Sequence, residues 1–448
     1  MNLYAFLQQH NKDGNPVRVG VIGAGKFATM YISQVKKVEG VHLVGVADID
    51  VGRAKEAFAR TMWPEEKYSA KTLEEASKTD KTCILEDSVK LIESPFVDII
   101  VEATGNPNVG IKHVLLCCEN KKHIIMVNVE TDAVAGPLLA KKAKEAGIIY
   151  SLAYGDQPAM ICEMVDWARA AGFEVVAAGK GTKYLPIYHK STPETVWKYY
   201  GISPENAAKG GMNPKMFNSF LDGTKSAIEM AAVSNATGLL SNPAGLQFPA
   251  CGTDDLHHIL RPASLGGILP HKGMVEVVSS IERDGRPVYR DIRFGIYVVM
   301  RGDTEYMKNC FKEYGILTDE TGEYISLTRP YHMIGLELGI SVASIGTRGE
   351  PTGYPRDFLS DVVATAKNDL SPGITLDGEG GYCVYGKLMT AKDSLAAGGV
   401  PLGLCNNVKL IRPVKEGSPI CWDDVEYDAT SQAVRIRKEM EEMFSKKN

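Results

Sequence analysis

The chain has 448 residues, of which 44% are hydrophobic and 23% charged, and its 50 Lys and Arg against 55 Asp and Glu give a net charge of −5. A chain of this length forms about two to four domains, each large enough to bury its own core. The slightly acidic balance argues against general electrostatic binding to nucleic acid or a membrane surface, and we expect neither partner.

No hydrophobic run approaches the roughly 18 residues of a membrane span. The start, MNLYAFLQQHNKDG, lacks the basic and hydrophobic regions of a signal peptide. The nine cysteines include no C-x-x-C pair, so their spacing predicts neither a zinc knuckle nor a disulfide framework. These features predict a cytoplasmic protein, and an enzyme is the simplest class.

The first 150 residues alternate short hydrophobic strands with longer helical stretches. We expect two helices, at 24–38 and 134–146, and five strands, at 17–22, 41–48, 97–104, 123–129 and 147–154. This alternation is typical of βαβ units and predicts a parallel sheet covered on both faces.

The pattern changes after residue 155. Helices are expected at 158–171 and 214–232 and strands at 173–182 and 293–301, whereas 183–213 is rich in Lys, Tyr, Pro and Gly and is expected to form a loop or lid. Gly and Pro cluster at 348–357, before short strands, turns and a charged C-terminal helix. We therefore predict an α/β protein with three parts: a Rossmann domain at 1–155, an α+β catalytic and dimerisation domain at 156–347, and a small, mostly-β domain at 348–448.

A glycine-rich segment follows the first expected strand and fits the pattern G-x-G-x-x-A of dinucleotide-binding proteins. Gly23 would make the tight turn, Gly25 would let a pyrophosphate approach the backbone, and the small Ala28 would let the helix pack on the strand. Lys26 and Phe27 lie between them, where the free N–H groups of the helix N-terminus would bind the pyrophosphate.

The second strand ends at Asp48, 25 residues after Gly23, close to where a ribose-binding acid belongs. Asp48 favours NAD because it would repel a 2′-phosphate, whereas Arg53 favours NADP because it could pair with that phosphate. The sequence leaves the choice open. We expect NADPH and do not exclude NADH.

Two further turns end strands of the same sheet. Thr104 and Gly105 follow the third strand, and Asn128 and Glu130 follow the fourth. Ligands of open α/β sheets lie outside the carboxyl ends of the strands, so both turns are expected to face the nicotinamide half of the cofactor. Glu130 would equally suit the first turn of a helix.

The second part of the chain holds an unusual group of lysines. Ammonium groups and exposed Gly-Gly amides suit a small anionic substrate, particularly a phosphate or a carboxylate. A lysine beside the hydride acceptor could also polarise a carbonyl. The catalytic candidates are Lys180, Lys183, Lys225 and Asp222, and the substrate-binding candidates are Lys209, Gly210, Gly211, Asn213 and Lys215. A solvated lysine face is the alternative.

Asp156 lies at the predicted junction of the first two domains, in AYGDQP. It could orient the substrate, chelate a divalent ion or cap the following helix. No metal-ligand spacing supports His257, His258 or His271 as a metal site. A divalent metal, Mg or Mn, is possible but has no assigned ligands, and the acids to test first are Asp156, Asp222, Glu229 and Glu130.

GAGKFA, EATGNP and YGDQP resemble the homoserine-dehydrogenase-like superfamily, although Glu130 stands where homoserine dehydrogenases have a lysine. Over nearly the whole length the chain resembles 1-deoxy-D-xylulose 5-phosphate reductoisomerase-like proteins, through segments such as VRVGVIGAGKFA, DGTKSAIEMA and RPYHMIGLELGISVA. The C-terminal part resembles a SAF-type module through KNDLSPG at 367–373 and PVKEGSPI at 413–420.

The resemblance implies reduction of 1-deoxy-D-xylulose 5-phosphate to 2-C-methyl-D-erythritol 4-phosphate by NAD(P)H, a step of isoprenoid precursor synthesis, in a homodimer. The phosphorylated substrate would suit the lysines. Two alternatives stay open: an oxidoreductase of another small hydroxy acid or sugar acid, and a non-catalytic cofactor-binding sensor. A shared fold does not decide among substrates.

Overall fold

The structure is a computed structural model that describes residues 2–445. The chain divides into two compact units, each formed from two segments. Unit 1 consists of Met1–Met160 and Met333–Arg356, and unit 2 consists of Ile161–His332 and Asp357–Asn448. Each unit is described by itself.

Unit 1 contains a six-stranded parallel sheet. Its strands are β1 (Val17–Ile22), β2 (Val41–Ala47), β3 (Cys83–Leu85), β4 (Ile99–Glu102), β5 (His123–Met126) and β6 (Tyr150–Leu152). They are arranged in the order β3-β2-β1-β4-β5-β6, with parallel pairing throughout. This is the doubly wound order of a Rossmann fold. The predicted α/β class and the parallel N-terminal sheet are confirmed.

Unit 1 also contains helices, most of which connect these strands. They are α1 (Leu3–Lys12), α2 (Lys26–Val35), α3 (Val51–Arg60), α4 (Leu73–Lys78), α5 (Ser88–Glu93), α6 (Pro107–Glu119), α7 (Val129–Glu145) and α15 (Gly339–Arg348). Side-chain oxygens of Asp50, Asn106 and Asn128 accept backbone N–H groups at the starts of α3, α6 and α7. Such N-caps decide where the helices begin, immediately after the strand ends.

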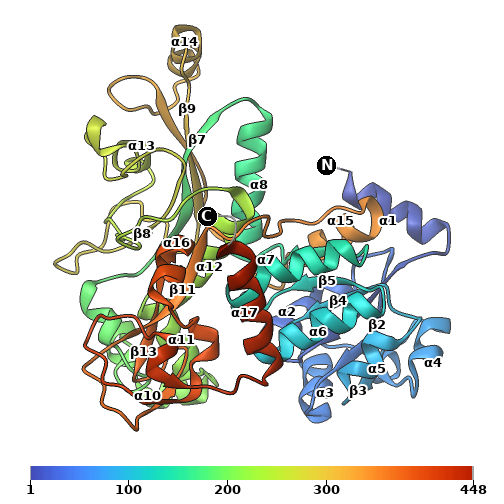
Figure 1. Cartoon of the computed structure of the whole chain (residues 1–448). Coiled ribbons are helices and arrows are strands. Elements are labelled where there is room, and N and C mark those ends of the chain that lie inside the picture. The colour runs from blue at the N-terminus through green and yellow to red at the C-terminus, as the bar shows by residue number, and fades with distance from the viewer. Residues whose placement is uncertain (1, 446–448) are drawn as a thin grey trace. The chain divides into compact units, whose positions relative to one another are not determined.

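The segment 333–356 returns to unit 1. There α15 lies beside α1 (Figure 1). The Cβ that a side chain at Gly346 would add would lie 2.5 Å from side-chain atoms of Val17 in β1, and the Ser341 hydroxyl accepts the backbone N–H of Tyr154 at 2.8 Å. These contacts are non-local, and they tie the segment to unit 1.

Unit 2 is built around a mixed four-stranded sheet. Its strands are β7 (Glu174–Thr182), β8 (Met274–Ser279), β9 (Ile296–Arg301) and β10 (Tyr324–Arg329), in the order β10-β9-β7-β8. Only β7 and β8 are parallel to each other. Gly179 in β7 allows a close approach, because a Cβ there would lie 1.8 Å from the carbonyl oxygen of Glu276 in β8.

The helices of unit 2 are α8 (Gln157–Ala170, which begins in unit 1), α9 (Val196–Tyr200), α10 (Pro204–Lys209), α11 (Pro214–Leu221), α12 (Thr224–Thr237), α13 (Leu256–Ile259), α14 (Glu305–Glu313), α16 (Ala391–Ala397) and α17 (Gln432–Ser445). The single helix expected at 214–232 is two helices. Asp222 and Gly223 separate α11 from α12, and Gly223 adopts φ +90°, a left-handed conformation that ends one helix before the next begins.

The segment 183–213 is more ordered than the expected loop or lid. It holds α9, α10 and a short 3-10 helix, Pro186–Lys190. Tyr188, Val196 and Trp197 are buried in a small hydrophobic cluster with Leu221 of α11. Hydrophobic side chains spaced along this segment therefore pack it against α11 and its neighbours.

The C-terminal part of unit 2 contains five strands: β11 (Ser360–Ala366), β12 (Thr375–Asp377), β13 (Val384–Thr390), β14 (Asn406–Leu410) and β15 (Val425–Glu426). β11 pairs with β13, and β12, β14 and β15 form a second small antiparallel sheet. These short strands agree with the expected texture, while the SAF-type assignment and the three-part division stay predictions. Among residues 2–445, no helix combines the length and hydrophobicity needed to cross a bilayer.

Candidate functional site

The turn between β1 and α2 has open backbone donors. Gly23 adopts φ +95°, and a Cβ there would lie 2.7 Å from the carbonyl oxygen of Ala103. Gly25 is the N-cap of α2, where no side chain accepts the first amides, and a Cβ at Gly25 would meet nothing within 4 Å. Lys26 is exposed, Phe27 is half-buried and Ala28 is fully buried. The N-terminus of α2 therefore presents unpaired N–H groups beside an open space, as an anion requires.

Asp48 follows β2 and is buried, with an exposed fraction of 6%. Its Oδ2 accepts the N–H of Ala24 at 2.6 Å, and its Oδ1 accepts the N–H of Asp50 at 2.8 Å. The guanidinium of Arg53 lies 3.8 Å from Oδ1 and is half-exposed. A carboxylate and a cation thus share the position where the adenosine ribose of a dinucleotide would bind.

The turns after β4 and β5 are bonded to each other. The Nδ2 of Asn128 donates to the carbonyl oxygen of Asn106 at 3.0 Å and lies 3.4 Å from the Thr104 hydroxyl. Gly105 is exposed and adopts φ +66°. Asn128 itself is buried and caps α7 by accepting the N–H of Thr131. Half-buried Glu130 lies in the first turn of α7.

Two functional candidates beside these turns escaped the sequence analysis. Glu102, the last residue of β4, is fully buried and accepts hydrogen bonds from Thr104 and from the imidazole of His113. The available signal was a carboxylate at the end of the otherwise hydrophobic strand IIVE. His113 carried no signal, because its spacing on α6 does not show which strand it faces.

The residues of this edge fit a dinucleotide. Gly23, Asp48, Thr104 and Asn128 follow β1, β2, β4 and β5, so they lie at the carboxyl edge of one parallel sheet. The open cradle at Gly25 accommodates a pyrophosphate, and the carboxylate of Asp48 suits a ribose hydroxyl. We call these residues the cofactor edge.

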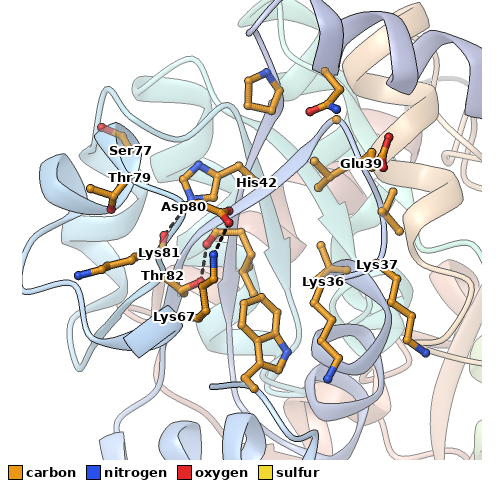
Figure 2. A pocket seen from close by; sticks show the side chains of 18 of the residues that line it. Lys36, Lys37, Glu39, His42, Lys67, Ser77, Thr79, Asp80, Lys81 and Thr82 are labelled. Carbon is orange, nitrogen blue, oxygen red and sulfur yellow. Dashed lines mark hydrogen bonds and ion pairs between the residues drawn. The ribbon is translucent and has the colours of Figure 1, made fainter. Parts of the chain in front are cut away.

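A wide pocket of about 850 Å³ lies at the opposite edge of the sheet, beside the start of β2 (Figure 2). Several of its polar groups are already bonded: Lys67 pairs with Asp80 at 2.5 Å, and the His42 Nε2 lies 2.8 Å from the carbonyl oxygen of Lys81. Lys36 donates to the carbonyl oxygen of Thr61 at 2.5 Å. These groups are already partnered within the fold, so we do not assign the cofactor to this pocket in spite of its volume.

In unit 2, Lys180 and Lys183 lie in different surroundings. Lys180, in β7, is buried and its Nζ forms an ion pair with the carboxylate of Glu229 in α12. Lys183 donates to the carbonyl oxygen of Tyr199 at 2.5 Å, and burial, helped by nearby Arg293, lowers its pKa. Lys180 and Glu229 thus form a buried acid–base pair within this unit.

Asp222 is fully buried and pairs with Lys367 at 2.8 Å. Lys367 also donates to the carbonyl oxygens of Ser191 and Gly381, at 2.7 and 2.8 Å, so its three protons are all used. Burial raises the pKa of Asp222, and Lys367 opposes that shift. This pair ties the C-terminal segment to the rest of unit 2, a structural role that the sequence did not show.

The other predicted substrate-binding residues lie on exposed ends of helices. Lys209 ends α10, Gly210 and Gly211 follow it, and Asn213 caps α11 by accepting the N–H of Lys215 at 3.0 Å. The Nζ of Lys215 donates to the carbonyl oxygen of Asp377 at 3.1 Å. These contacts stabilise helix ends and leave the substrate role a prediction.

Two predicted site residues lie at the starts of helices. Lys225 is half-buried in the first turn of α12. Asp156 is buried at the start of α8, where its Oδ1 accepts the N–H of Gln157 at 2.9 Å. Within the described residues no group of three or more His, Cys, Asp or Glu side chains is arranged to hold a metal ion.

Family models match two segments of the chain. Residues 17–127 match the GFO/IDH/MocA model, described as oxidoreductase family, NAD-binding Rossmann fold. Residues 155–338 match the model described as oxidoreductase DRL, catalytic domain. A search of curated proteins gives no significant match. Both family matches are to oxidoreductases, and the first covers the cofactor edge up to the turn after β5.

Several solved structures similar to this chain are dehydrogenases or other oxidoreductases. A probable dehydrogenase from Thermotoga maritima is 16% identical over 75% of this chain and 90% of its own, with a TM-score of 0.35. Myo-inositol dehydrogenase from Lactobacillus casei, solved with NAD(H) and myo-inositol, is 19% identical over 40% of this chain and 50% of its own, with a TM-score of 0.26. An Agrobacterium radiobacter oxidoreductase, solved with NAD+, L-tartaric acid and magnesium, is 16% identical over 38% of this chain and 44% of its own, with a TM-score of 0.27. In the last two cases the match spans about half of the solved chain.

The family matches overturn the resemblance to reductoisomerase-like members of the homoserine-dehydrogenase-like superfamily. The Rossmann segment matches the GFO/IDH/MocA oxidoreductases instead. The motif GAGKFA misled because the pattern G-x-G-x-x-A occurs in dinucleotide-binding proteins of many families, and a short strand-end turn such as EATGNP does not distinguish among them. The assignment to isoprenoid synthesis is withdrawn with the resemblance. The chain is an NAD(P)-dependent oxidoreductase: residues 17–127 match an NAD-binding Rossmann model of oxidoreductases, and residues 155–338 match the catalytic-domain model of oxidoreductase DRL.

Proposed function

We propose that the protein is a dehydrogenase that transfers hydride between NADP(H) and a hydroxyl-bearing carbon of a small anionic hydroxy acid or sugar acid. The observation that carries the proposal is the open N-terminus of α2 at Gly25, beside the buried Asp48. The match of residues 155–338 to an oxidoreductase catalytic domain supports it.

The preference for NADP(H) rests on the charges beside Asp48. Both oxygens of Asp48 accept backbone N–H groups, so its charge is partly compensated within the turn. Arg53 is half-exposed and lies 3.8 Å away, which leaves its guanidinium accessible to a 2′-phosphate. We expect Arg53→Ala to weaken NADPH binding about tenfold and NADH binding little, measured by cofactor fluorescence. Equal weakening of both would contradict this preference.

The bound cofactor supplies the hydride acceptor or donor, and the protein must handle the hydroxyl proton. We assign this task to Lys180, whose buried ammonium is held by the carboxylate of Glu229. The exposed Lys209 and Lys215 suit attraction of an anionic substrate, whether carboxylate or phosphate.

The test is cofactor reduction by the purified protein with a panel of hydroxy acids, sugar acids and their phosphorylated forms, with and without Mg or Mn. We expect turnover with at least one member and loss of about 100-fold or more in kcat for Lys180→Met, with unchanged cofactor affinity. Lys312→Ala, an exposed lysine on α14, is the matched control.

Cofactor binding without turnover on the whole panel would instead favour a cofactor-binding sensor. A Lys180→Met/Glu229→Leu variant distinguishes loss of catalysis from loss of folding. It removes both charges of the buried pair, so it leaves no unpaired buried charge to destabilise the unit. Light scattering on the same preparations tests the predicted homodimer.

A further inference from the structure

A buried carboxylate lies directly beneath the turn after β4. Glu102 is fully buried, and its Oε1 accepts the Thr104 hydroxyl at 2.5 Å and the Nδ1 of His113 at 3.2 Å. Its Oε2 has no hydrogen-bond partner among residues 2–445. A buried carboxylate costs free energy, and a leucine would complete this hydrophobic strand without that cost. We therefore look for the role of Glu102 in its hydrogen bonds to Thr104 and His113.

The contacts of Glu102 set the direction of the neighbouring hydrogen bonds. An ionised carboxylate only accepts, so the Nδ1 of His113 donates to it and the Nε2 can accept the Ser88 hydroxyl, 2.9 Å away. The Thr104 hydroxyl proton likewise points at Glu102. Thr104 is half-buried, and this bond holds its side chain in one rotamer.

Asn128 extends this chain of contacts to the next strand. Its Nδ2 lies 3.4 Å from the Thr104 hydroxyl and donates to the Asn106 carbonyl oxygen at 3.0 Å, while its Oδ1 accepts the N–H of Thr131 at 3.1 Å. The turn after β4 and the turn after β5 are thus held at a set spacing. Both turns lie at the carboxyl edge of the sheet, where the nicotinamide half of a dinucleotide binds.

We propose that Glu102, supported by His113, is a positioning residue that fixes Thr104 and the spacing of these two turns for the nicotinamide half of the cofactor. Neither side chain touches the cofactor in this role. The inference deepens the proposed function and rests on the cofactor assignment. It predicts that the network affects one half of the cofactor and leaves the adenosine half unaffected.

The experiment compares NADPH with 2′-phospho-ADP-ribose, which lacks the nicotinamide. We expect Glu102→Leu and Thr104→Val each to weaken NADPH binding about tenfold, because either change removes the Thr104–Glu102 hydrogen bond that holds the turn in place, and to change 2′-phospho-ADP-ribose binding less than about twofold. Glu102→Gln restores most of the NADPH affinity, because the amide oxygen still accepts from Thr104. The same comparison is repeated with NADH and ADP-ribose.

Thr82→Val is the matched control, because it removes a buried hydrogen bond, 2.7 Å from the Thr82 hydroxyl to the carbonyl oxygen of Leu43, among the residues that line the pocket at the opposite edge. Its cofactor affinities should not change. Equal weakening of both ligands by Thr104→Val, or no weakening of either, overturns the positioning role. If the unmodified protein binds neither ligand, the cofactor assignment itself fails. Thr104→Val keeps the test decisive even if Glu102→Leu does not fold, because Thr104 is only half-buried and valine has its shape.

Discussion

The cofactor edge of unit 1 and the Asp222–Lys367 pair of unit 2 handle polar groups in opposite ways. At the cofactor edge, backbone amides stay unpaired beside the open space at Gly25. In unit 2, two full charges are buried, and all three protons of Lys367 are used within the fold. Asp222 therefore stabilises the fold of unit 2, whereas the turn at Gly25 keeps its amides available to a ligand.

The largest effect should come from breaking the buried pair. Lys367→Met leaves Asp222 charged and unpaired, and we expect a loss of about 3–5 kcal/mol in the free energy of unfolding of unit 2. Urea denaturation followed by tryptophan fluorescence measures it, since Trp197 is buried in this unit. Cofactor affinity should stay unchanged under native conditions.

Asp222→Leu/Lys367→Met should regain most of that stability, because it removes both charges. Lys415→Ala is the control, as it breaks an exposed pair with Asp369 and should have little effect. A small loss for Lys367→Met would show that the pair is not essential to unit 2.

The next effect concerns the open turn. Gly25→Val should weaken NADPH binding about 100-fold, because a branched side chain would occupy the space of the pyrophosphate. The melting temperature should hardly change, since a Cβ at Gly25 meets nothing within 4 Å. Calorimetric titration and thermal melts measure the two quantities.

Gly23→Val is the contrasting variant. It should destabilise unit 1, because its Cβ would lie 2.7 Å from the carbonyl oxygen of Ala103 and the residue adopts φ +95°. Normal cofactor binding by Gly25→Val would remove the assignment of the cofactor edge.

The last effect separates the two units by the pH dependence of their stability. Burial raises the pKa of Asp132 in unit 1 from 3.8 to about 7 and that of Glu276 in unit 2 from 4.5 to about 7. The unfolded chain therefore loses these protons first as the pH rises. Each group's contribution to the free energy of unfolding is fully present below the group's ordinary pKa. As the pH rises from there to about 7, this contribution falls by up to about 1.4 kcal/mol per pH unit.

Asp132→Asn should flatten the pH dependence of the free energy of unfolding for unit 1 alone. Glu276→Gln should do the same for unit 2 alone. Denaturation between pH 4 and about 8 measures both. In the unmodified protein the Tyr150 hydroxyl donates to Asp132 at 2.8 Å. The amide oxygen of the Asp132→Asn variant can still accept this hydrogen bond. An unchanged slope in either variant would contradict the corresponding pKa shift.

Much of unit 1 could be predicted, because its strands are continuous hydrophobic runs. β1 matches its predicted range, and the strands predicted at 41–48, 97–104, 123–129 and 147–154 extend past β2, β4, β5 and β6. β3 has only three residues, too few for a periodic pattern, and it was missed. The helix expected at 214–232 is interrupted at Gly223, since hydrophobic periodicity does not show a left-handed residue.

The sequence by itself determined the parallel N-terminal sheet, the glycine turn and Asp48, because each is indicated by residues close along the chain. Tertiary structure alone decided which charges became partners. Lys180 meets Glu229, 49 residues away, and Asp222 meets Lys367, 145 residues away. A buried charge costs free energy unless an opposite charge or hydrogen bonds compensate it. Its partner is determined by which distant strands and helices pack together.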